Sequence, residues 1–169
     1  MRYQAYLFLS LYMLIEPTYT PKQYWMTILS AGILSGILSS TVYFLLYFFF
    51  YVQQSFLFSL IYLIPLLAST VALVFFKYKF IWKDFSYCAA FFMSFLTAFL
   101  SAIILSLALY FAYSSHLESR IELFSNVDKE TLQRLMSPTA VSLSMFFINI
   151  ILSLLYSLII AIFAKRKIK

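Results

Sequence analysis

The sequence predicts an all-α membrane protein: a bundle of four transmembrane helices with an amphipathic extracytoplasmic connector between the third and fourth helices. Hydrophobic residues make up 64% of the 169 residues and charged residues 11%, against roughly 45–50% and about 25% in soluble domains. Several long runs contain no Asp, Glu, Lys or Arg. These runs are continuously apolar, whereas strands of a transmembrane barrel are ~10-residue segments that alternate apolar and polar residues.

The same composition excludes several other classes of protein. A disordered chain combines low hydrophobicity with high net charge. A disulfide scaffold needs several cysteines, and a zinc site normally needs four ligands, but Cys88 and His116 are the only cysteine and histidine. We therefore expect no metal, no cofactor and no catalytic set of nucleophile, base and acid. The net charge of +6 could suggest nucleic-acid binding. That function needs a folded surface rich in basic residues, and the sequence predicts none, so we expect no nucleic-acid partner.

Residues 1–21 form an N-terminal segment ahead of the transmembrane domain of residues 22–169. Its uncharged part, residues 3–15, is too short to span a bilayer, which takes about 20 residues. We prefer an interfacial helix. A cleaved signal is less favoured because no small-x-small cleavage site follows. A start-site error, with Met13 or Met26 as the true start, is the third reading.

The first two spans come from a run of 54 residues without charge between Lys22 and Lys77. Such a run is too long for one span and suits two spans joined by a tight turn. Its one strongly polar break is the Gln-Gln-Ser sequence at residues 53–55. We therefore expect helices over about 24–51 and about 55–76.

The third and fourth spans follow from two further runs without formal charge. Residues 85–117 predict a helix over about 87–113. Residues 135–164 predict a helix over about 139–163. Together with the first two helices, they complete a domain that crosses the membrane four times.

The connector between these two spans covers residues 116–136. Its apolar residues are spaced mostly three and four apart, which predicts an amphipathic helix. We expect it to lie on the outer membrane surface or on the top of the bundle, and a docking helix for a partner is the less favoured alternative. Ser137 suits the N-cap of the last helix, and Pro138 suits its first turn.

Basic residues determine the predicted orientation. The N-terminal segment, the loop after the second helix and the C-terminus hold nine of the twelve Lys and Arg residues. Under the positive-inside rule, both termini then lie in the cytoplasm. We expect the lipid bilayer and its anionic headgroups as partners. The basic residues assigned to topology are Lys77, Lys79, Lys83, Lys165, Arg166, Lys167 and Lys169.

Small and polar residues inside the spans predict where the helices touch. Gly32, Gly36 and Ser40 repeat every four residues, a pattern that lets two helix backbones approach closely. We favour contact with another helix of the same chain, and a homodimer face is the alternative. In the fourth span we expect Asn149 to make an interhelical hydrogen bond, with Ser153 on the same face. A contact between Asn149 and a substrate is less favoured.

Several features occur together in the chain from about residue 22 onward. They are Gly32 and Gly36, the Lys-Asp-Phe sequence at 83–85, the connector at 117–136 and the basic tail at 165–169. This combination resembles an uncharacterised four-helix inner-membrane family of Bacteroidota, domain of unknown function 4199. The resemblance is mostly one of topology. It implies a bacterial four-helix protein of the inner (plasma) membrane and supplies no activity.

Three functions compete on this sequence. The absence of charge within the spans and of a catalytic set favours a non-enzymatic protein of unknown biochemical role, a small subunit or scaffold with a membrane-protein partner or in a homo-oligomer. Serines along the third and fourth helices motivate the alternative, an oligomeric pore, transporter or lipid-handling protein. Ion-coupled transporters usually place ionisable groups near the midplane, and these spans hold none. An enzyme acting on lipid is the least favoured.

Overall fold

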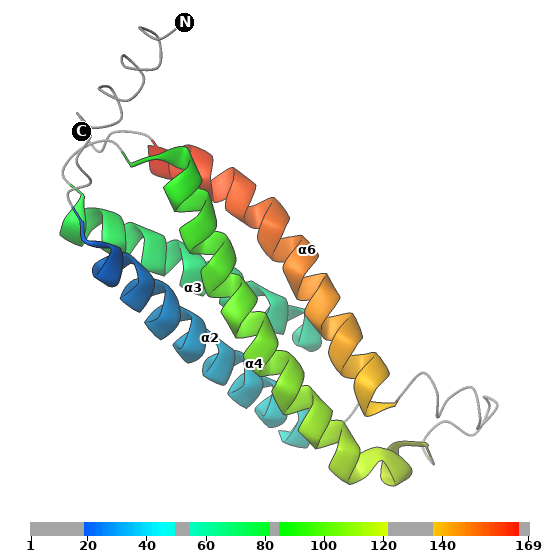
Figure 1. Cartoon of the computed structure of the whole chain (residues 1–169). Coiled ribbons are helices and arrows are strands. Elements are labelled where there is room, and N and C mark those ends of the chain that lie inside the picture. Colours follow the sequence, from blue (N-terminus) through cyan, green and yellow to red (C-terminus); the bar gives the residue numbers. More distant parts are fainter. Residues whose placement is uncertain (1–18, 50–54, 82–84, 122–136, 166–169) are drawn as a thin grey trace, which may run out of the picture.

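The structure of the chain is a computed structural model that describes four stretches, residues 19–49, 55–81, 85–121 and 137–165. Within them the chain forms four long helices (Figure 1). These helices are α2 (Pro21–Phe49), α3 (Ser55–Phe80), α4 (Tyr87–Ile121) and α6 (Pro138–Lys165). Each helix is long and apolar enough to cross a membrane. The chain is therefore an all-helical, multi-pass membrane protein, as predicted.

Each predicted span corresponds to one helix, but two helices are longer than expected. α3 ends at Phe80 rather than at residue 76, and so includes Lys77 and Lys79. α4 ends at Ile121 rather than at residue 113, so the first part of the predicted connector continues α4. Charge does not end α3, because the lysines in its last turn interact favourably with the negative end of the helix dipole. α4 also contains no Gly or Pro that would interrupt it.

Several predicted features lie outside the described residues and stay predictions. They are most of the segment 1–21, the turn residues 53–54, Lys83, the connector residues 122–136, and the tail residues Arg166, Lys167 and Lys169. The amphipathic character of the connector and its position on the membrane surface belong to this group. The same holds for the three readings of the N-terminal segment.

Capping side chains begin two of the helices. The hydroxyl oxygen of Ser137 accepts a hydrogen bond from the Ala140 amide at 3.3 Å, and Pro138 is the first residue of α6, so the predicted N-cap is confirmed. α2 begins with a reciprocal capping box. The Thr20 hydroxyl accepts from the Gln23 amide at 3.3 Å, and the Gln23 side-chain oxygen accepts from the Thr20 amide at 2.9 Å.

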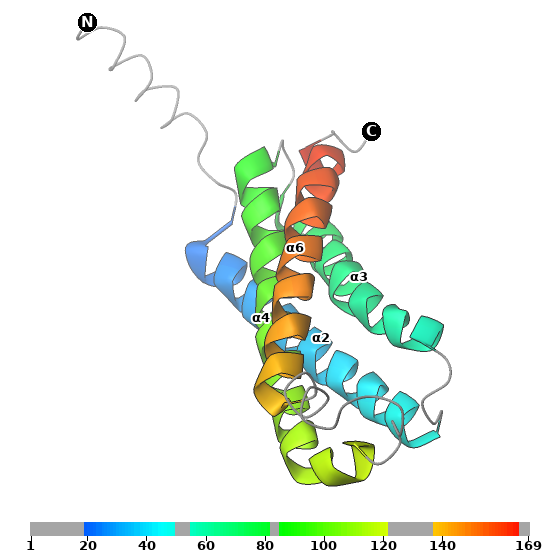
Figure 2. The ribbon, with the colours of Figure 1, turned by 90° about the vertical axis from the view of Figure 1, so that its right-hand side faces the viewer.

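α4 is the central helix of the bundle. It packs against α2, α3 and α6, whereas α2 and α6 do not touch within the described residues. α4 and α6 run side by side, while α3 diverges from α6 toward its own first turn (Figure 2). We call the end of the bundle that holds the first turn of α2 and the last turn of α3 the basal end. The opposite end is the distal end.

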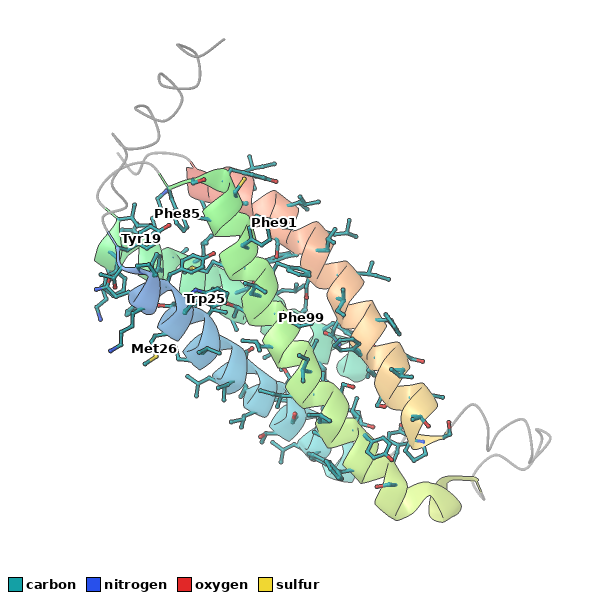
Figure 3. The ribbon with its side chains drawn as sticks, viewed as in Figure 1. Tyr19, Trp25, Met26, Phe85, Phe91 and Phe99 are labelled. Atoms are coloured by element: carbon teal, nitrogen blue, oxygen red, sulfur yellow. The ribbon has the colours of Figure 1, made fainter. Side chains whose placement is uncertain are left out.

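Two hydrophobic clusters fill the interior. The basal cluster includes the buried side chains of Ile28, Phe76, Phe85 and Met93. The distal cluster consists of the buried residues Tyr43, Ile61, Leu105 and Leu109. Tyr19 closes the basal end, where its ring meets the edge of Phe76 at a centroid distance of 5.1 Å and lies near Phe85 (Figure 3). Burial raises the pKa of the Tyr19 phenol above its usual value, so this hydroxyl stays protonated further into the alkaline range than an exposed tyrosine does.

Candidate functional site

The described residues bring the predicted packing residues into contacts between helices of one chain, beginning with the glycines of α2. A Cβ atom built on Gly32 would lie 2.8 Å from the Leu100 Cβ and 3.0 Å from the Thr97 carbonyl oxygen. A Cβ atom on Gly36 would lie 2.7 Å from the Ile104 Cβ. These distances leave no room for a side chain, so the close approach of α2 to α4 depends on glycine. We predicted that this face contacts either another helix of the same chain or a second copy of the chain. The structure shows contact with α4 of the same chain.

Most buried hydroxyls in the spans are satisfied by their own helix. Ser40, the third member of the small-residue face, is buried and donates to the Gly36 carbonyl at 2.8 Å. Ser39 donates to the Ser35 carbonyl at the same distance. Ser153 likewise donates to the carbonyl four residues earlier. Such bonds let serine lie inside a membrane bundle without an interhelical partner.

Asn149 differs from the prediction. Its side chain is 2% exposed, and its amide nitrogen donates to the Met145 carbonyl of the same helix at 2.8 Å. The expected interhelical hydrogen bond is therefore wrong for the described residues. An amide side chain on a helix reaches the carbonyl one turn earlier without any movement of a neighbouring helix, and that local partner competes with a distant one.

Two hydrogen bonds set the register of α4 against α6. The Ser106 hydroxyl donates to the Ser142 carbonyl at 3.1 Å, and the Tyr87 hydroxyl donates to the Leu158 carbonyl at 3.3 Å. Between these bonds lie six polar residues that are at most 2% exposed, namely Ser94, Thr97, Ser101, Asn149, Ser153 and Ser157. Phe91 and Phe99 flank this seam on the side of α4 that faces α6 (Figure 3). The interior of the bundle along α4 and α6 is thus lined by small polar residues beside a row of aromatic rings.

Three of these buried hydroxyls have no hydrogen-bond partner among the described residues. They belong to Ser94 and Ser101 of α4 and to Ser157 of α6. A buried hydroxyl without a partner disfavours the folded state. These three hydroxyls are therefore the least well satisfied of the buried polar groups that the structure describes.

α3 and α6 are joined by long side chains rather than by close backbones. The Tyr62 hydroxyl donates to the Met145 sulfur at 2.7 Å, near the distal end. Midway, the hydroxyls of Thr70 and Tyr156 lie 2.9 Å apart and share a hydrogen bond. The α3 and α6 backbones approach each other less than those of any other packed pair of described helices. The sequence pattern had pointed to none of these bridging residues.

The third bridge corrects the prediction for Lys77, which was expected in a loop. Lys77 lies inside α3, is 8% exposed, and donates from its ammonium to the Ala164 carbonyl. α6 ends one residue later at Lys165, where the last carbonyls of a helix lack intrahelical partners. Lys77 thus caps the end of α6. Lys79 instead is exposed, with its ammonium 5.2 Å from the centre of the Phe75 ring.

The chemistry available to the described residues is that of packing and hydrogen bonding. They contain no group of three or more His, Cys, Asp or Glu side chains that could hold a metal ion. Cys88 is exposed near the start of α4. No family model, curated protein or solved structure matches this chain. The residues of the site are therefore interpreted from their geometry alone.

Proposed function

We propose that this protein is a non-enzymatic integral membrane protein that acts as a small subunit or scaffold in a membrane assembly. The observation that carries this proposal is the uncovered surface of α6. Within its most apolar stretch, 22% of residues are buried inside the chain, compared with 33%, 39% and 44% for the other three spans. Among the described helices, α6 is therefore the one least covered by the rest of the chain, and its outward face is open to a neighbouring protein.

This free surface of α6 consists of large aliphatic and aromatic side chains. Its exposed residues include Leu143, Phe147, Ile151, Leu155, Ile159 and Ile162. Most small residues of α6 are buried, so the outward face is made mainly of large side chains that can pack against another helix or against lipid. A helix of a partner protein would gain van der Waals contacts along its whole length there.

Photo-crosslinking tests the proposed partner surface. We expect benzoylphenylalanine at Ile151 or Leu155 to give a crosslink to a defined polypeptide in native membranes. Leu34 on α2 is 68% exposed and serves as the matched control, because it faces outward on a helix that the bundle covers better. Adducts with lipid alone at Ile151 and Leu155, or the same protein adduct at Leu34, would contradict the proposal.

The second candidate is a pore, a transporter or a lipid-handling protein. The three hydroxyls without partners favour it, because a polar interior is what a solute path requires. Five serines of α4 and α6 are buried inside the single bundle, namely Ser94, Ser101, Ser142, Ser153 and Ser157, which weighs against a pore formed between several copies. Flux of a neutral solute into liposomes that contain the purified protein would favour this candidate over the scaffold.

We further propose that both termini lie in the cytoplasm of a bacterium, with the chain in the inner membrane. The nine-to-three distribution of basic residues supports this orientation. The exposed side chains of Lys22, Trp25 and Lys79 suit contact with anionic headgroups at the basal end. The resemblance to the four-helix family of Bacteroidota supports the bacterial setting.

Cysteine labelling tests this orientation in a Cys88→Ser background, which removes the one native cysteine. We expect Ser125→Cys to react with an impermeant thiol reagent from outside intact cells. Lys167→Cys should react only after permeabilisation. The reverse pattern would overturn the orientation and leave the four spans intact.

A further inference from the structure

Pro65 interrupts the backbone hydrogen bonding of α3 from within. It lies in the interior of the helix, whereas Pro21 and Pro138 are the first residues of α2 and α6, where no hydrogen bond is lost. In α3 the missing amide hydrogen leaves the Ile61 carbonyl without its bond from one turn later, and the proline ring crowds that carbonyl. Pro65 is also fully buried. The turn at residues 61–65 is therefore where α3 bends most easily, although the helix continues through it.

The parts of α3 before and after the proline belong to different hydrophobic clusters. Leu73 and Phe76 lie in the basal cluster together with Ala161 and Ala164 of α6. Ile61 lies in the distal cluster, whose other buried members come from α2 and α4. The basal part of α3 thus shares its buried cluster with α6, whereas the distal part shares its buried contacts with α2 and α4.

Hydrogen bonds between α3 and α6 show the same division. After the proline, Lys77 and Thr70 both bond to oxygen atoms of α6, a carbonyl and a hydroxyl respectively. Before it, the Tyr62 hydroxyl donates to the Met145 sulfur at 2.7 Å, and a thioether sulfur is a weak acceptor. In this part α3 also diverges from α6 toward its first turn (Figure 2). The distal part of α3 is therefore held to α6 less firmly than the basal part.

We propose that α3 is hinged at Pro65, so that its distal part moves away from α6 and back while its basal part stays fixed to α6. The bond from Tyr62 to Met145 is the latch of this hinge, because it starts in the hinge turn and joins the two helices. Loss of the latch shifts the population toward the open arrangement, since that contact exists only in the closed one. Neighbouring groups in a membrane bundle satisfy the carbonyl that a proline frees, so the hinge is compatible with the bilayer.

Distances between pairs of spin labels test the hinge in a Cys88→Ser background. The distal pair is Ser59→Cys on α3 with Ser144→Cys on α6. The matched basal pair is Val74→Cys with Ile159→Cys, whose native side chains are 45% and 56% exposed, so these labels need no space inside the bundle. In nanodiscs, double electron–electron resonance should give two distances for the distal pair and one for the basal pair.

Three substitutions then act on the hinge or control for it. Tyr62→Phe removes the latch and keeps the ring, and we expect it to raise the ratio of open to closed arrangements about threefold, the effect of an average interhelical hydrogen bond in a membrane. Tyr156→Phe removes the bond to Thr70 after the proline and should leave the distal distances unchanged. Pro65→Ala restores a donor to the Ile61 carbonyl and should reduce the distal pair to one distance.

Three results would overturn the proposal. The first is a distal distribution as narrow as the basal one in the otherwise native chain. The second is a ratio of arrangements that Tyr62→Phe leaves unchanged or that Tyr156→Phe raises equally, and this comparison stands even if Pro65→Ala fails to fold. The third is a folded Pro65→Ala protein that keeps both distal distances. The hinge is independent of the outward face of α6, so a rigid α3 would leave the scaffold function untouched.

Discussion

Gly36→Leu is expected to lower the thermal stability of the bundle more than any substitution at an outward-facing position. The Cβ atom alone would lie 2.7 Å from the Ile104 Cβ, and the rest of the leucine side chain would push α2 and α4 apart. Overpacking of a tight contact costs about 1–3 kcal/mol. In lipid this contact is a main source of helix association, because no hydrophobic effect favours helix over acyl chain. The measurement is the melting temperature of purified variants in detergent.

Gly32 and Leu34 supply the comparison for this prediction. Gly32→Leu should have a similar effect, because its Cβ would lie 3.0 Å from the Thr97 carbonyl oxygen, a backbone atom that cannot rotate away. Leu34→Ala removes a side chain that is 68% exposed and should change the melting temperature little. If both glycine variants have the same melting temperature as the wild type, the glycine face does not hold α2 to α4.

Lys77→Met is expected to give the second large loss of stability. Methionine keeps the length and apolar stem of the side chain but cannot donate to the Ala164 carbonyl at the end of α6. A hydrogen bond that involves a charged group contributes about 1.5–3 kcal/mol. The loss should appear in the melting temperature and as faster proteolysis after residue 160, where the last turn of α6 would fray.

The neighbouring lysine is the control for this variant. Lys79→Met removes an equal charge from the same helix turn, but the Lys79 side chain is exposed and lies over the Phe75 ring. An exposed cation–π contact contributes about 0.5–1 kcal/mol, so Lys79→Met should lower the melting temperature less than Lys77→Met does. Equal melting temperatures for the two variants would mean that Lys77 acts through its charge and not as a cap.

The number and order of the helices followed from the runs without charge, because a bilayer tolerates no unpaired charge along a span and sets its length. The helix ends could not be predicted in the same way. Each span was assumed to end where charged residues begin, whereas α3 and α4 continue past that point. Lys77 and Lys79 belong to α3 because a long side chain can carry its charge away from the backbone. The capping box at Thr20 and Gln23 was readable as a T-x-x-Q sequence and would have placed the start of α2 correctly.

The contacts of individual side chains were less predictable. Spacing placed Gly32 and Gly36 on one face, but only the fold shows that α4 covers them. The Asn149 amide could bond either to its own helix or to a neighbouring one. Which of the two it reaches depends on how near α3 and α4 come, and the sequence does not give that distance. Tyr62, Thr70 and Tyr156 gave no signal, because aromatic and hydroxyl residues are common in every span of this chain.

The central position of α4 has a consequence for biogenesis. The N-terminal part of a chain leaves the ribosome first, so α2 and α3 enter the bilayer before the helix that joins them to α6. During that interval the glycine face of α2 lacks the helix that covers it in the complete bundle. Arrival of α4 closes that face, and α6 then docks onto a finished three-helix unit. A chain that stops before residue 87 would lack α4 and leave the glycine face of α2 without its partner helix.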